Sequence, residues 1–96
     1  MGEPRTFDET RALIGANLRR VRKARGLSQE KAGELVGLSR STMGYYEQGR
    51  RNPSLQSLHK MAVAYDVDLS EFFRFERFVP AYLDDEDPEE EPEKDQ

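Results

Sequence analysis

The run from residue 29 to residue 48 limits most strictly the fold that this chain can adopt. It contains two segments whose apolar residues recur at helical spacing. A serine, which is a preferred N-cap residue, stands directly before each segment, and a glycine, which often ends a helix in the left-handed conformation, stands directly after each. We therefore predict two short helices that meet at a tight turn around Gly37, at residues 29–36 and 40–48.

The rest of the body follows the same helical pattern. Thr6 and Glu9 form a capping-box pair ahead of the first apolar run, and Asp68 with Glu71 repeats that spacing later in the chain. No stretch alternates between apolar and polar residues for long enough to predict a strand. The sequence predicts an all-α domain of five helices, with the remaining three at residues 7–25, at residues 55–65 and from residue 69 onward.

Charge is divided unevenly along the chain. Residues 1–60 contain 12 Lys and Arg residues against 6 Asp and Glu residues, whereas residues 81–96 contain 1 against 9. The net charge of −4 therefore combines a basic body with an acidic end. Such asymmetry is typical of a chain whose basic part binds a polyanion.

The acidic end, residues 84–96, is expected to be a disordered tail. It has two prolines and almost no apolar side chain, so it cannot bury enough surface to offset the entropy that ordering would cost. Two roles stay open for it. One is a solvated tail that aids solubility, and the other is an intramolecular competitor that covers the basic face and weakens non-specific binding.

Composition excludes several classes of site. The chain has no Cys and one His, which excludes disulfide scaffolds, thiolate or histidine-based metal sites and cysteine nucleophiles, and no cofactor is expected. An enzyme is the least supported class, because no nucleophile, base and orienting group recur at a useful spacing. No apolar run approaches the roughly 18 residues of a membrane span, and the N-terminus lacks the apolar stretch of a secretion signal. We therefore expect a cytoplasmic protein without membrane contact.

Residues 14–73 resemble the phage-repressor-like helix-turn-helix family, also called the lambda-repressor-like or xenobiotic-response-element type. The resemblance is carried by the run LSQEKAGELVGLSRSTMGYYEQGRRNPSLQSL and by the later DLSEFF. It implies a five-helix DNA-binding domain at residues 7–74, whose helix-turn-helix unit is residues 29–48. In that family the second helix of the unit enters the major groove of double-stranded DNA.

The resemblance also implies a role for individual residues. Three residues of the second short helix would read base edges, namely Arg40, Ser41 and Tyr45. Five would bind phosphates, namely Gln29, Ser39, Gln48, Arg50 and Arg51. An ion pair would support the recognition helix, between Arg22 and Glu47. Taken by themselves, the residues leave open that Arg40 binds only phosphate and that Tyr45 is a surface aromatic without a role.

The aromatic residues near the end of the body exceed what one small core needs. They are Phe72, Phe73, Phe75, Phe78 and Tyr82. Some of them could close the core of the monomer. Because so apolar a patch would otherwise be exposed, we predict that these residues form a homodimer interface, with residues 75–83 as a dimerisation segment.

The function predicted from these features is a dimeric, sequence-specific transcriptional regulator, a repressor rather than an activator, that reads an inverted-repeat operator through the major groove. The alternative is an antitoxin-type interaction module. In that case the domain would control its own operon, and the aromatic segment or the acidic tail would neutralise a protein partner.

Overall fold

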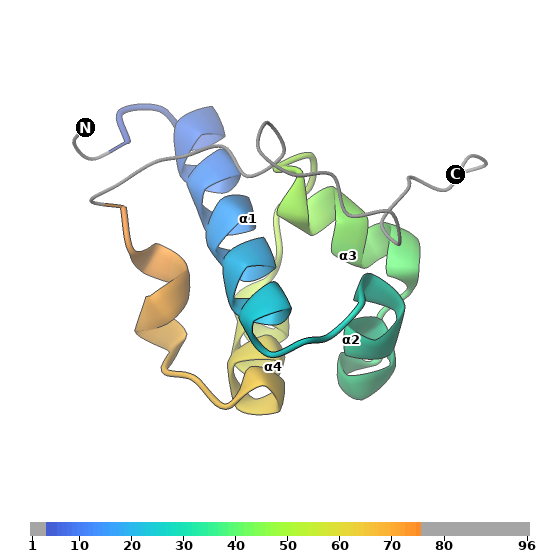
Figure 1. Cartoon of the computed structure of the whole chain (residues 1–96). Coiled ribbons are helices and arrows are strands. Elements are labelled where there is room, and N and C mark those ends of the chain that lie inside the picture. Colours follow the sequence, from blue (N-terminus) through green and yellow to red (C-terminus); the bar gives the residue numbers. More distant parts are fainter. Residues whose placement is uncertain (1–3, 76–96) are drawn as a thin grey trace.

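The computed structural model describes residues 4–75 of the 96-residue chain. In this part of the chain all regular structure is helical, and four α-helices and one 3-10 helix enclose a single core (Figure 1). The predicted all-helical class is confirmed. The elements are α1 (Phe7–Ala24), α2 (Gln29–Val36), α3 (Arg40–Glu47), α4 (Leu55–Tyr65) and the 3-10 helix η1 (Leu69–Phe73).

Local capping signals set the starts of all four α-helices. The hydroxyl oxygens of Thr6, Ser28, Ser39 and Ser54 each accept the backbone N–H three residues further on, at 3.0 Å. Glu9 completes the predicted capping box, because its carboxylate accepts the backbone N–H of Thr6. The helix starts at residues 7, 29, 40 and 55 are therefore confirmed, and the helix ends differ from prediction by at most one residue.

The fifth helix, which was predicted from residue 69 onward, is not an α-helix. Residues 69–73 form a short 3-10 helix, and Asp68 makes no side-chain capping bond there. The backbone carbonyls of Phe72 and Arg74 instead accept hydrogen bonds from the Asn17 side-chain amide on α1, at 3.1 and 2.9 Å. Because α1 satisfies these carbonyls and the core holds Phe72, the segment lies flat against α1 rather than continuing as an α-helix.

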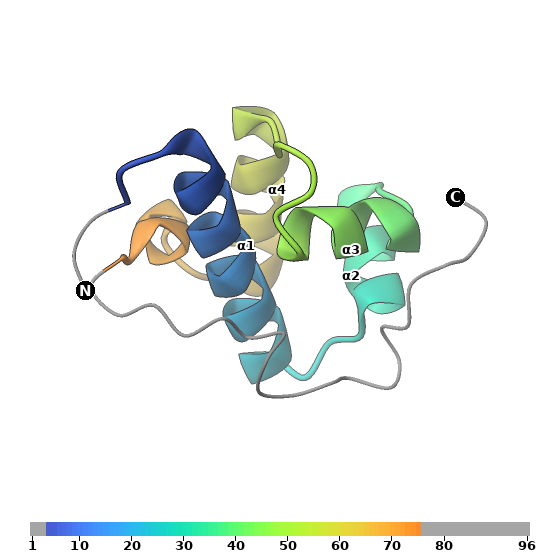
Figure 2. The same ribbon diagram turned by 90° about the horizontal axis from the view of Figure 1, so that it is seen from above.

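The core lies where α1 meets the other elements. α1 packs against α3 on one side and against η1 on the other, while α2 packs against α3 and α4. Figure 2 shows the same order from above, with α1 between η1 and the pair of α2 and α3. The largest apolar side chains of this core are fully buried, and they are Leu18, Met43, Met61, Tyr65 and Phe72.

Gly15 decides how closely α1 approaches the end of α3. A Cβ atom at this position would lie 2.6 Å from the backbone carbonyl oxygen of Tyr46 and 2.7 Å from that of Glu47. Both distances are too short for any larger residue, and backbone cannot move aside as a flexible side chain can. The absence of a side chain at Gly15 therefore allows the end of α3 to pack directly on α1.

Candidate nucleic-acid interface

Two glycines, Gly33 and Gly37, allow the tight turn between α2 and α3. Gly37 has a φ of 79°, in the left-handed region, and the N–H groups of Gly37 and Leu38 both bond the carbonyl oxygen of Gly33, at 2.7 and 2.9 Å. A Cβ atom at Gly33 would collide with the carbonyl oxygen of Leu38, so the turn can close only over a glycine. This tight turn sets the angle at which α3 leaves α2.

A buried ion pair ties the inner side of α3 to α1. Arg22 donates from Nε to Oε2 of Glu47 at 2.7 Å and from Nη2 to Oε1 at 3.0 Å, and both side chains are at most 2% exposed. The Gln29 side chain on α2 donates to the same Oε1 at 3.1 Å. One carboxylate therefore joins three helices, and the predicted pair of Arg22 and Glu47 is present in the structure.

Burial has a definite electrostatic effect on this carboxyl group. It raises the pKa of Glu47 above the ordinary value, because the charged form loses its water, while the Arg22 guanidinium and the hydrogen bonds from Arg22 and Gln29 act to lower it. The remaining Nη1 of Arg22 donates to the carbonyl oxygen of Leu27 at 2.6 Å. The charges are thus compensated within the protein, and this side of α3 is a support rather than a binding surface.

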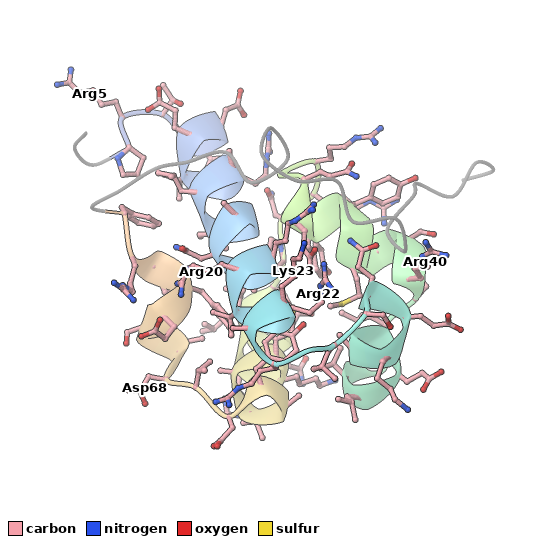
Figure 3. The ribbon with its side chains drawn as sticks, in the orientation of Figure 1. Arg5, Arg20, Arg22, Lys23, Arg40 and Asp68 are labelled. Carbon is pink, nitrogen blue, oxygen red and sulfur yellow. The ribbon has the colours of Figure 1, made fainter. Side chains whose placement is uncertain are left out.

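The opposite side of α3 faces outward. Arg40 and Ser41 lie on its first turn and are partly exposed. Arg40 projects from the end of α3 that is farther from α1, whereas Arg22 and Lys23 extend from α1 toward α3 (Figure 3). Among the charged residues of α3, the acidic one is buried and the basic one is accessible.

A second cationic group gathers at the other end of α3. The guanidinium carbons of Arg50 and Arg51 lie 5.0 and 4.5 Å from the ring centroid of Tyr45, within the range of cation–π contacts. Arg50 also donates from Nη1 to Oε1 of Gln48 at 3.2 Å. Both arginines are exposed, and Tyr45 is partly exposed. The outer side of α3 therefore presents cations at both ends of one short helix.

The geometry of two short helices around a glycine turn, with an accessible second helix, is that of a known family. The family described as a helix-turn-helix domain matches residues 13–73. This chain belongs to the helix-turn-helix domain family.

Relatives match over this domain and differ in length. The HTH-type transcriptional regulator PuuR of Escherichia coli (strain K12) is 41% identical over 59 residues, which cover 62% of this chain and 32% of PuuR. The immunity repressor protein of Bacillus phage phi105 is 37% identical over 57 residues, which cover 59% of this chain and 40% of that protein. The match to this chain thus spans about a third of the length of PuuR.

A solved structure agrees with the fold. The restriction-modification controller protein C.AhdI from Aeromonas hydrophila aligns with a TM-score of 0.63 and 45% sequence identity. The alignment covers 65% of this chain and 94% of that chain. The helix-turn-helix domain of this chain therefore resembles nearly the whole of that structure.

Two of the predicted phosphate ligands of the helix-turn-helix domain already have other partners. Ser39 caps α3, and its hydroxyl donates to Oγ1 of Thr42 at 3.0 Å. Gln29 is 4% exposed, and its amide nitrogen is bonded to Glu47. A phosphate contact donated by Ser39 would require its hydroxyl to leave Thr42, whereas the Gln29 amide has a second N–H beside the one bonded to Glu47, and the roles of both as ligands stay predictions.

Arg11 is a residue that sequence reasoning missed. It lies on α1, donates from Nε to the carbonyl oxygen of Gly49 at 2.8 Å and donates from Nη1 to Oδ1 of Asn52 at 3.4 Å. It therefore holds the loop that carries the two exposed arginines after α3. No motif marks this contact, because its partners lie 38 and 41 residues away in the chain.

The predicted dimer interface needs a correction. Phe72 is fully buried and stacks edge to face on Tyr65, with ring centroids 6.3 Å apart, so it belongs to the core of the monomer and offers no surface. Phe73 is 40% exposed and contacts Phe75 in a similar edge arrangement. The two remaining members, Phe78 and Tyr82, lie outside the described residues, as does the acidic segment 84–96.

Residues 4–75 contain no group of three or more His, Cys, Asp or Glu side chains that could hold a metal ion. Within the same residues, no helix combines the length and apolar character that crossing a membrane requires.

Proposed function

We propose that this chain is a sequence-specific DNA-binding transcriptional regulator that acts as a homodimeric repressor. The observation that carries the proposal is the two-sided character of α3, whose inner side is locked to α1 and α2 while its outer side presents accessible cations. The names of its relatives support this function, since PuuR is a transcriptional regulator and the phi105 protein is an immunity repressor.

Recognition would use the outer side of α3. An α-helix such as α3 is about 10–12 Å across with its side chains, which fits a major groove about 12 Å wide. Arg40 and Ser41 would contact base edges from its first turn, with Arg40 donating two bonds to a guanine. Arg50 and Arg51 would grip the phosphates beyond its last turn.

Dimerisation would double this contact. Two copies related by a two-fold axis would place their α3 helices in successive major grooves, about 34 Å apart, and would read an inverted repeat. The exposed Phe73 with its neighbour Phe75 is the described part of the surface that we propose for the dimer. Bound over a promoter, such a dimer would exclude the transcription machinery and repress.

The proposal is tested by selecting bound sequences from a random duplex library at about 150 mM salt, where specific binding outlasts the phosphate contribution. We expect an inverted repeat with half-site centres one helical turn apart. Arg40→Ala should relax the preference at one base of each half-site, by about 1–3 kcal/mol for each half-site. The charge-matched control is Lys60→Ala, because Lys60 is exposed beside the groove between α2 and α4 rather than on α3.

The opposite result would favour the second function considered from the sequence. If no motif is enriched and binding disappears as salt rises, DNA contact is non-specific. Co-purification of a small basic protein would then identify this chain as an antitoxin-type interaction module. Equal losses for Arg40→Ala on selected and random duplexes would contradict its role as a reader while leaving its role in phosphate binding.

A further inference from the structure

The Tyr45 ring contacts two cations. Its centroid lies 5.0 Å from the guanidinium carbon of Arg50 and 4.5 Å from that of Arg51. Arg50 also donates a hydrogen bond to the side chain of Gln48, which follows Tyr45 by three residues in the sequence. Thus one aromatic side chain of α3 organises both exposed arginines of the loop that follows it.

This arrangement has a physical reason. Like charges repel each other, and long exposed side chains ordinarily sample many rotamers. The negative face of an aromatic ring attracts both cations and narrows the space that they sample. Arginines restricted in this way lose less conformational entropy when they bind an anion.

The backbone of the same loop is also restrained. Arg11 bonds the carbonyl oxygen of Gly49 and the side chain of Asn52, which flank the two arginines in the sequence. Gly49 itself has a φ of 74°, which turns the chain sharply after α3. The backbone is therefore held from α1 while the side chains are held from α3.

We propose that Tyr45 is a positioning residue that holds Arg50 and Arg51 together as one prearranged site for the phosphodiester backbone of duplex DNA. It acts through the two arginines and does not itself select a base. The proposal rests on the function proposed above, and it changes the role that the sequence suggested for Tyr45. The ligand is a pair of neighbouring phosphates, whose charges two guanidinium groups held at one ring would match.

The test compares Tyr45→Leu, which removes the ring, with Tyr45→Phe, which keeps it. Binding is measured by fluorescence anisotropy on two duplexes of equal length, the selected inverted repeat and a random sequence, between 50 and 200 mM salt. We expect Tyr45→Leu to weaken both duplexes by the same factor, about 3- to 10-fold. Tyr45→Phe should stay within about twofold of the parent chain, because the ring face rather than the hydroxyl makes the contact.

A cycle with the arginines isolates the coupling. In a chain that already carries Arg50→Ala and Arg51→Ala, Tyr45→Leu should cause no further loss, since the groups that it positions are gone. A loss of the same size in both backgrounds would overturn the proposal. So would a loss confined to the selected duplex, which would make Tyr45 a reader of a base, or equal losses for Tyr45→Phe and Tyr45→Leu, which would assign the contact to the hydroxyl.

A measurement without DNA keeps the proposal distinct from the proposed function. The side-chain proton resonances of Arg50 and Arg51 should carry ring-current shifts in the parent chain and in Tyr45→Phe, and should lose them in Tyr45→Leu. Absence of these shifts in the parent chain would overturn the inference even if DNA binds. Their presence in a chain that binds no duplex would instead count against the proposed function alone.

Discussion

The two sides of α3 use the same functional group for opposite purposes. On the inner side, the Arg22 guanidinium is fully buried and donates hydrogen bonds to Glu47 and to a backbone carbonyl. On the outer side, the guanidinium groups of Arg50 and Arg51 are exposed, and the Tyr45 ring that they contact carries no net charge. Removing a partner from the first kind of charge should affect folding, and removing the second kind should affect only binding.

The strongest test of this contrast is Arg22→Met. The substitution leaves the Glu47 carboxylate buried without its cation, so we expect the free energy of unfolding to fall by about 3–5 kcal/mol. Urea denaturation followed by circular dichroism measures the loss. The control is the double variant Arg22→Met with Glu47→Leu, in which no charge is left unpaired and much of the stability should return. An unchanged urea midpoint for the single variant would show that the pair does not support the fold.

The packing of the inner side is tested by two helical glycines, Gly15 on α1 and Gly44 on α3. Gly15→Ala would place a Cβ atom 2.6 Å from a backbone carbonyl oxygen of α3, and we expect a loss of about 1–3 kcal/mol of stability. Gly44→Ala is the matched control, because its Cβ atom would lie 3.6 Å from the Gln29 side chain, which is an ordinary contact distance. That control should be tolerated or even stabilising, since alanine favours a helix over glycine by up to about 1 kcal/mol. Thermal unfolding of both variants decides the matter, and equal melting temperatures would contradict the close approach of α1 and α3.

On the outer side, we expect the double variant Arg50→Ala with Arg51→Ala to leave stability within about 0.5 kcal/mol of the parent chain. Its effect should appear in DNA binding, where the slope of log affinity against log salt should fall in magnitude by about 2 for each bound subunit, or about 4 for the dimer. A titration of salt with the selected and the random duplex measures that slope. A change in the urea midpoint comparable to that of Arg22→Met would remove the distinction between the two sides.

The smallest effect concerns a buried polar group without a partner. The Tyr65 hydroxyl is buried and has no hydrogen-bond partner among the described residues, and burial raises the pKa of this phenol. Tyr65→Phe removes a buried hydroxyl that has lost its water without gaining a hydrogen bond, so the free energy of unfolding should stay unchanged or rise by up to about 1 kcal/mol. Urea denaturation provides the comparison. A clear loss of stability would mean that the hydroxyl forms a hydrogen bond in solution and that this bond stabilises the fold.

Several features of the site could be predicted from the sequence because their causes are local. A serine cap and the N–H that it accepts are three residues apart, so the starts of α2 and α3 follow from the chain alone. The pairing of Glu47 with Arg22 was predictable only through the family resemblance, since 25 residues separate them. The burial of Gln29 followed from neither, because it depends on how α2 and α3 pack.

The sequence by itself determined an all-helical chain, the starts of its α-helices and the glycine turn that joins α2 to α3. Each of these depends on groups within about four residues of one another, where propensity and capping act directly. Only the tertiary structure decided that residues 69–73 form a 3-10 helix bonded to Asn17, that Phe72 lies in the core and that Arg11 holds the loop after α3. Those contacts join residues 38 to 55 positions apart, and side-chain packing selects them only once the helices have come together.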